Sequence, residues 1–160
     1  MGGKRTFGVT AESGSSLRER SATLLAPDRS ERAFPQSSGS NMHAFIIEDE
    51  YLIGQSVGNM LEKLGFTSFS FARSEDAAIA GAKTEAIDLI TADVRLLPGD
   101  GVRAVEKICE KRAIPVVFIT GYLEELQDRA PTAIVVQKPV RENELAAAVH
   151  NALRERRADS

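Results

Sequence analysis

The hydrophobic and polar positions of the chain follow two alternating patterns from residue 44 to the C-terminus. Short continuous apolar runs, which suit strands buried on both faces of a sheet, alternate with stretches whose apolar residues recur at helical spacing. Gly65 marks the end of the first helical stretch, and Ser74 can cap the start of the second. The predicted strands are Ala44–Glu48, Phe66–Phe71, Ile87–Ala92, Pro115–Ile119 and Ala133–Val136, and the predicted helices are Glu50–Leu64, Ser74–Thr84, Gly101–Arg112, Leu123–Arg129 and Arg141–Arg156.

Strands and helices that alternate in this way predict a doubly wound α/β domain, with five parallel strands in one sheet and helices on both faces. In such folds the reactive side chains gather at the carboxyl ends of the strands. The residues that follow each predicted strand are therefore the first candidates for a functional site.

Residues 1–42 show neither pattern and are rich in Ser and Gly. They carry six basic and four acidic residues, a balance of +2, whereas residues 43–160 carry 14 basic and 19 acidic residues, a balance of −5. A segment of this composition buries too little apolar surface to offset the entropy lost on ordering. We therefore predict a disordered leader over 1–42, with Met42 as an alternative start, and one folded domain over 43–160.

The overall composition excludes several classes of protein. The formal net charge of −3 argues against a dedicated nucleic-acid binder. The single cysteine excludes an intrachain disulfide framework and any CxxC metal or redox site. No apolar run is long enough to span a membrane and the N-terminus has no apolar signal region, so we expect a cytoplasmic protein.

Four of the five predicted strand ends carry charged or hydroxyl side chains. These residues are Glu48, Asp49 and Glu50 after the first strand, Asp93 after the third, Thr120 after the fourth and Lys138 after the fifth. Carboxylates that meet in a crevice of low dielectric constant repel one another unless a cation is present. Mg²⁺ suits a site of a few carboxylates, waters and a phosphate.

The same side chains suit phosphoryl transfer. With its charge neutralised by a metal, Asp93 can attack a phosphoryl group as a nucleophile. Lys138 and the hydroxyl of Thr120 are suitable donors for the oxygens of the transferred group, because this reaction depends chiefly on positioning and electrostatics.

Each of these residues also has an ordinary structural interpretation. Acids before a helix favour its N-terminus, an aspartate or a Thr-Gly pair can serve a turn, and a lysine can be a solvated surface charge. Their joint occurrence at the ends of successive strands is what favours a site. We interpret Asp100 as a helix N-cap, Cys109 as a core residue, and His43 and His150 as solvated side chains without an implied partner.

The ordered set of motifs resembles the receiver domains of two-component response regulators. The matching residues lie within 43–157 and are Ile46–Glu50, Asp93, Leu96, Pro98–Gly101, Thr120–Gly121 and Lys138–Pro139. The resemblance implies a sheet of strand order 2-1-3-4-5 with five helices, CheY-like in type, and phosphorylation of Asp93. It also implies Mg²⁺ held by Glu48, Asp49, Asp93 and a backbone carbonyl, that of Arg95.

A narrower resemblance lies in residues 115–122. Their sequence, PVVFITGY, is similar to the PFxFATGY signature of single-domain receivers in alphaproteobacterial general stress signalling, although Val116 and Ile119 differ from it. Residues 117–139 also resemble the receiver half of PhyR-type regulators. The leader is too short and polar to form the sigma-like domain of those proteins, so we expect a receiver without it.

The switch residues depart from a common receiver pattern. Many receivers carry an aromatic residue three positions before the lysine, where this chain has Val135. Tyr122, two residues after Thr120, is a nearby aromatic able to report on the position of the hydroxyl. Pro131 shortens the segment between Thr120 and Lys138, so we expect the fourth helix to be short and mobile.

Taken with the resemblance, the sequence predicts a stand-alone phosphoacceptor with no DNA-binding or enzymatic output domain. It would accept a phosphoryl group on Asp93 from a histidine kinase or histidine phosphotransferase, and then, as a monomer, contact a downstream protein or act as a phosphate sink. Two alternatives remain. A pseudo-receiver that only binds protein would typically lack one of Asp49, Asp93, Thr120 and Lys138, all of which are present, and a phosphatase with an aspartate nucleophile would need an acid in place of Arg95.

Overall fold

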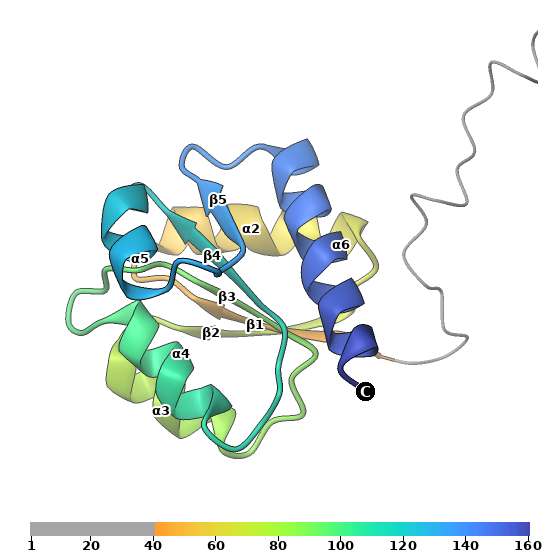
Figure 1. Ribbon diagram of the computed structural model, residues 1–160, viewed down its shortest axis with the longest axis horizontal. Coiled ribbons are helices and arrows are strands. Elements are labelled where there is room, and N and C mark those ends of the chain that lie inside the picture. The colour runs from red at the N-terminus through yellow and green to blue at the C-terminus, as the bar shows by residue number, and fades with distance from the viewer. Residues whose placement is uncertain (1–40) are drawn as a thin grey trace, which may run out of the picture. The chain divides into compact units, whose positions relative to one another are not determined.

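Five strands run parallel in one sheet within residues 41–160, the part of the chain that the computed structural model describes (Figure 1). The strands are β1 (His43–Ile47), β2 (Ser68–Ala72), β3 (Leu89–Ala92), β4 (Val116–Thr120) and β5 (Val135–Gln137). They lie in the order β2-β1-β3-β4-β5, which confirms the predicted fold. The predicted leader, residues 1–42, lies outside the described residues except for its last two.

Helices cover both faces of the sheet. They are α2 (Tyr51–Lys63), α3 (Glu75–Ala82), α4 (Gly101–Cys109), α5 (Leu123–Arg129) and α6 (Glu142–Ala158). Figure 1 shows α3 and α4 below the sheet and α2 and α6 above it, with α5 beside the end of β4. None of these helices has the length and apolar character needed to cross a bilayer.

The starts and ends of several helices follow local sequence signals. The Ser74 hydroxyl accepts a hydrogen bond from the Ala77 N–H at 3.2 Å, so the predicted N-cap of α3 is confirmed. Gly65, just past the end of α2, has a φ of 103°, a conformation that glycine adopts without strain. The short helix α5 has the predicted bounds.

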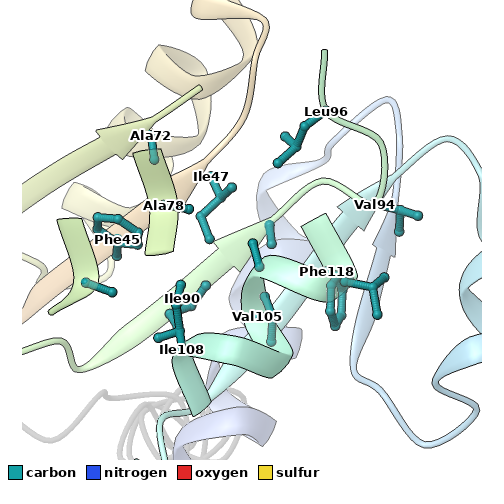
Figure 2. Packing of buried hydrophobic residues seen from close by; sticks show 14 of the residues in the cluster. Phe45, Ile47, Ala72, Ala78, Ile90, Val94, Leu96, Val105, Ile108 and Phe118 are labelled. Carbon is teal, nitrogen blue, oxygen red and sulfur yellow. The ribbon is translucent and has the colours of Figure 1, made fainter. Parts of the chain in front are cut away.

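The main apolar cluster lies between the sheet and α3, α4 and α5 (Figure 2). Phe45 and Ile47 of β1 point into it, alongside Ile90 of β3 and Phe118 of β4. Burying side chains of this size contributes about 1.5–3 kcal/mol each. From α5, a single buried side chain, Leu126, joins the cluster, so this helix has a small apolar anchor.

Strand β2 begins two residues later than its alternating pattern predicts. Phe66 is only 1% exposed, and its N–H donates to the Leu61 carbonyl at 3.2 Å, so it closes the turn after α2. The carbonyl of Met42 then accepts from the N–H groups of Thr67 and Ser68 before regular pairing with β1 begins. The first aromatic residue of the pattern therefore belongs to the turn.

The prediction that His43 is solvated is wrong. Its ring lies 2.8 Å from the Ser68 hydroxyl through Nδ1 and 3.1 Å from a Glu85 oxygen through Nε2, and the residue is half-buried. Pairing between β1 and β2 places Ser68 opposite His43, whereas Glu85 lies in the segment between α3 and β3. His150 is likewise half-buried in α6. Cys109 packs against the core but is only partly buried, and burial raises the pKa of its thiol.

Candidate metal and phosphoacceptor site

The carboxyl ends of β1 and β3 bring Glu48 and Asp93 to the same edge of the sheet. Their preceding residues, Ile47 and Ala92, are register partners on adjacent strands, and the Asp93 N–H donates to the Ile47 carbonyl at 3.0 Å. Glu48 and Asp93 directly follow these register partners, so the two acids emerge side by side. Glu48 and Asp93 are 6% and 7% exposed, so two carboxylates lie almost buried beside each other.

Asp49 completes a cluster of three carboxylates. One oxygen from each of Glu48, Asp49 and Asp93 lies within 4.8 Å of the others. The Oδ2 atom of Asp49 accepts a hydrogen bond from the Leu97 N–H at 3.2 Å, and Oε1 of Glu48 accepts from the Glu50 N–H at 3.1 Å. Backbone groups thus orient two of the three acids.

Lys138, which follows β5, reaches into this cluster. Its Nζ lies 2.7 Å from Oδ2 of Asp93 and 3.0 Å from Oε2 of Glu48. Oε1 of the exposed Glu50 is 3.9 Å away. One ammonium therefore bridges the two buried carboxylates and offsets part of their charge.

Burial and ion pairing oppose each other in this cluster. Burial raises the pKa of Glu48 above its ordinary value, and the hydrogen bonds from Lys138 and the Glu50 N–H reverse only part of that effect. Burial alone would lower the pKa of Lys138, but its hydrogen bonds to Asp93 and Glu48 raise it. The ammonium is therefore charged at neutral pH and tightly paired.

The loop after Asp93 is fixed by close backbone packing. The Gly101 N–H donates to the Val94 carbonyl at 2.8 Å, and a Cβ at Gly101 would lie 1.6 Å from the Asp93 carbonyl oxygen. Only glycine fits at this approach. Val94 and Leu96 are buried, while the N–H of Arg95 faces Oδ1 of Asp93 at 3.4 Å.

Thr120 is the last residue of β4 and is fully buried. Its hydroxyl oxygen accepts a hydrogen bond from the Tyr122 N–H at 3.0 Å, so the hydroxyl is engaged with the chain that leads into α5. Tyr122 is 47% exposed, and the guanidinium carbon of Arg95 lies over its ring, 3.8 Å from the ring centroid. Arg95 also pairs with Glu125 of α5 at 3.0 Å, which raises the pKa of the guanidinium.

Asp100 has the predicted capping role and a second one. Its carboxylate accepts from the Arg103 N–H at 2.8 Å and caps α4. Both oxygens also accept from Arg129, at 2.8 and 3.0 Å, which ties α4 to the end of α5. Burial opposes ionisation, but the hydrogen bonds from Arg129 and the Arg103 N–H hold the pKa of Asp100 below its ordinary value.

The carboxylate cluster fits a hard divalent cation. Its three side chains offer oxygen donors within reach of one another, and two of them are almost buried with one ammonium to offset their charge. Mg²⁺ prefers oxygen ligands of this kind and retains waters at its remaining positions. Arg95, whose backbone carbonyl the family resemblance implies as a further ligand, lies in the loop that borders the cluster.

Three features of the site were not predicted from the sequence. The Leu97 N–H binds the Asp49 carboxylate, Gly101 permits the tight loop after Asp93, and the Arg73 guanidinium donates to the Asp49 carbonyl. Gly101 follows Gly99 and Asp100, a pattern that also suits an ordinary helix start. Arg73 directly follows β2, the one strand from whose end the sequence predicted no site residue.

Comparisons with known proteins agree with this geometry. A family model described as response regulator receiver domain matches residues 44–150. The phyllosphere-induced regulator PhyR of Methylorubrum extorquens is 32% identical over 112 residues, which cover 68% of this chain and 42% of that protein. The chain thus spans less than half the length of this relative.

Solved structures give the same result. The PhyR response regulator REC domain of Erythrobacter litoralis has a TM-score of 0.67 and 32% identity, covering 71% of this chain and 91% of that one. The response regulator PhyR of Brucella abortus has a TM-score of 0.72 and 30% identity, covering 89% of this chain and 58% of that one.

Proposed function

Because the chain belongs to the family of response regulator receiver domains, we propose that it accepts a phosphoryl group on Asp93 in a two-component phosphorelay. The observation that carries this proposal is the position of the Asp93 carboxylate. It is almost buried, lies beside Glu48 and Asp49, and is hydrogen-bonded to Lys138 through one oxygen. A nucleophile with an adjacent cation and a group of metal-binding oxygens is the arrangement that phosphoryl transfer requires.

The proposed donor is a phosphohistidine of a histidine kinase or phosphotransferase. A carboxylate oxygen of Asp93 forms a bond to phosphorus as the bond between phosphorus and the donor imidazole nitrogen breaks, and the imidazole leaves with that electron pair. Lys138, already 2.7 Å from Asp93, would then pair with an oxygen of the transferred group. The Thr120 hydroxyl, at the end of the adjacent strand β4, would donate to another.

Glu48, Asp49, Asp93 and the backbone carbonyl of Arg95 would hold Mg²⁺ in this proposal. When bound, Mg²⁺ offsets the negative charge of the carboxylates and of the incoming phosphoryl group. The protein residues supply the orientation. Leu97 and Glu50 hold the carboxylates of Asp49 and Glu48 through their N–H groups.

The signal would leave the domain through protein contact or through competition for phosphoryl groups. The similar solved structure of the anti-anti-sigma factor PhyR of Bartonella quintana supports the first route, because that name describes a protein that counteracts an anti-sigma factor. We accordingly propose a role in general stress signalling. The part of the surface that responds would include Tyr122 and α5, which contact the loop after Asp93 through Arg95.

A phosphoramidate assay tests the proposed function. Phosphoramidate carries a phosphorus–nitrogen bond like that of phosphohistidine, and with Mg²⁺ it should shift the protein on a phosphate-affinity gel. Hydroxylamine, which cleaves acyl phosphates, should reverse the shift. A chain that remains unshifted would indicate a receiver-like binding module without phosphoacceptor activity, and a shift that resists hydroxylamine would place the phosphate on another kind of side chain.

We also propose that the folded unit begins at Met42. The Met42 carbonyl accepts from Thr67 and Ser68 at the start of β2, and β1 follows directly. A chain of residues 42–160 should melt at the temperature of the full chain and accept phosphate at a similar rate. A large fall in either quantity would show that the preceding residues belong to the domain.

A further inference from the structure

Arg73 reaches the carboxylate cluster from the end of β2. It directly follows Ala72, which is the register partner of Ile47 and whose carbonyl accepts from the Glu48 N–H at 2.9 Å. This pairing sets Arg73 opposite the segment that leaves β1. Its Nε and Nη2 both donate to the carbonyl oxygen of Asp49, at 3.1 and 2.9 Å.

Asp49 stands in a bend between β1 and α2, outside the regular hydrogen bonding of either element. Arg73 holds its carbonyl, and the Leu97 N–H holds Oδ2 of its carboxylate at 3.2 Å. One contact comes from the end of β2 and the other from the loop after β3. Together they hold the backbone and the side chain of Asp49. The backbone conformation of Asp49 sets the direction in which its side chain leaves the chain. By holding the Asp49 carbonyl, the guanidinium therefore influences the direction of the Asp49 carboxylate.

We propose that Arg73 is a positioning residue for the divalent-cation site, which it serves by holding the Asp49 backbone so that the Asp49 carboxylate faces Glu48 and Asp93. The inference rests on the proposed function and adds a residue to it. Two N–H groups of a planar guanidinium can share one carbonyl oxygen, whereas the ammonium of a lysine is a flexible point donor. An Arg-to-Lys change therefore keeps the charge and removes the fork.

The charge of Arg73 and its positioning of Asp49 should have opposite effects on the affinity for the cation. An experiment can therefore distinguish the two roles. A positive charge beside the cluster repels a divalent cation, so the charge of Arg73 taken alone would weaken binding. Arg73→Lys leaves that repulsion in place. A loss of cation affinity in this variant therefore reports the loss of positioning.

The test compares Arg73→Lys with the same substitution at Arg156. Arg156 pairs with Asp88, which precedes β3 and so lies at the amino ends of the strands, away from the carboxylate cluster. The first readout is the Mg²⁺ dissociation constant from calorimetry on the full chain. For Arg73→Lys it should rise about three-fold or more, as expected for the loss of one charge-assisted hydrogen bond. For Arg156→Lys it should equal the wild-type value.

The second readout is the rate of phosphorylation by acetyl phosphate as a function of Mg²⁺ concentration. Arg73→Lys should require more Mg²⁺ for half the maximal rate and reach the wild-type rate at saturation, with an unchanged melting temperature in the absence of Mg²⁺. Wild-type affinity in Arg73→Lys, or a loss of affinity that matches a fall in metal-free stability, would overturn the inference. Absence of Mg²⁺ binding in the wild type would instead refute the proposed metal site itself.

Discussion

Replacing Lys138 by methionine should destabilise the domain in a way that depends on pH. The ammonium bridges Asp93 at 2.7 Å and Glu48 at 3.0 Å, and their side chains are only 8% and 4% exposed. Removing one partner of a fully buried ion pair costs about 3–5 kcal/mol. Because the Lys138 side chain is 19% exposed, water screens part of the interaction, and we expect a loss of roughly 2–3 kcal/mol at pH 7.

The pH dependence follows from the pKa of Glu48. Burial already raises the pKa of Glu48, and the hydrogen bond from Lys138 is the largest effect that lowers it. Loss of this hydrogen bond in Lys138→Met should therefore raise the pKa of Glu48 further. An acid whose folded-state pKa lies above its unfolded value destabilises the fold when it ionises, and this loss disappears as the pH falls through the folded-state pKa. The stability gap between wild type and Lys138→Met should therefore narrow from pH 7 towards pH 5.

Urea unfolding followed by circular dichroism measures this gap. With a slope of about 1.5 kcal/mol/M, the midpoint of Lys138→Met should fall by roughly 1.3–2 M at pH 7. Mg²⁺ should restore more stability to the variant than it adds to the wild type, because the cation no longer competes with the ammonium. Lys63→Met, at the exposed pair with Glu142, is the matched control and should change stability by less than about 1 kcal/mol at either pH.

A variant as stable as the wild type at pH 7 would refute this reasoning. So would a gap of the same size at pH 5 and pH 7, because the destabilisation would then not arise from ionised carboxylates. In either case Lys138 would not be the group that offsets the charge of Glu48 and Asp93.

Three further predictions follow from the same site. Gly101→Ala should lower the free energy of unfolding by about 3 kcal/mol or more in urea titrations, since the new Cβ would meet the Asp93 carbonyl at 1.6 Å. Mg²⁺ should raise the melting temperature of the wild type, and Asp49→Ala should remove that shift while remaining folded. Beryllofluoride, a phosphoryl mimic, should shift the amide NMR signals of residues 94–100 and 120–131 more than those of α6, and Tyr122→Ala should still accept phosphate but lose part of the response in α5.

Each of these has a contrary result. Wild-type stability of Gly101→Ala would show that the loop after Asp93 can relax at little cost. A Mg²⁺ shift that survives in Asp49→Ala would place the cation elsewhere. A full NMR response in Tyr122→Ala would assign the switch to the loop after Asp93 instead.

The hydrophobic pattern predicted the sheet and its helices because buried parallel strands and amphipathic helices leave different spacings in sequence. The caps at Ser74 and Asp100 were predictable as well, since each depends on a hydrogen bond spanning three residues. The shifted start of β2 was not, because Phe66 looks the same in a turn as in a strand and only its packing decides. Local signals were sufficient where the structure depends on neighbours in sequence.

The candidate site divides in the same manner. The rule that parallel strand ends share an edge was enough to gather Glu48, Asp93 and Lys138. Contacts such as that of Arg73 with Asp49, or of His43 with Glu85, depend on the register between distant strands and on side-chain reach. No spacing in the sequence predicts these contacts, because an exposed arginine and a histidine at the start of a strand can each reach many different hydrogen-bond partners.

Intact-mass measurement after incubation with acetyl phosphate and Mg²⁺ tests the central claim most directly. Asp93 is the almost buried carboxylate that is bound by Lys138 and lies within 4.8 Å of carboxylate oxygens of Glu48 and Asp49, so the wild type should gain the mass of one phosphoryl group. Asp93→Asn should retain the fold and gain none. An unmodified wild type, or a phosphoryl adduct on Asp93→Asn, would contradict the assignment of Asp93 as the phosphoacceptor.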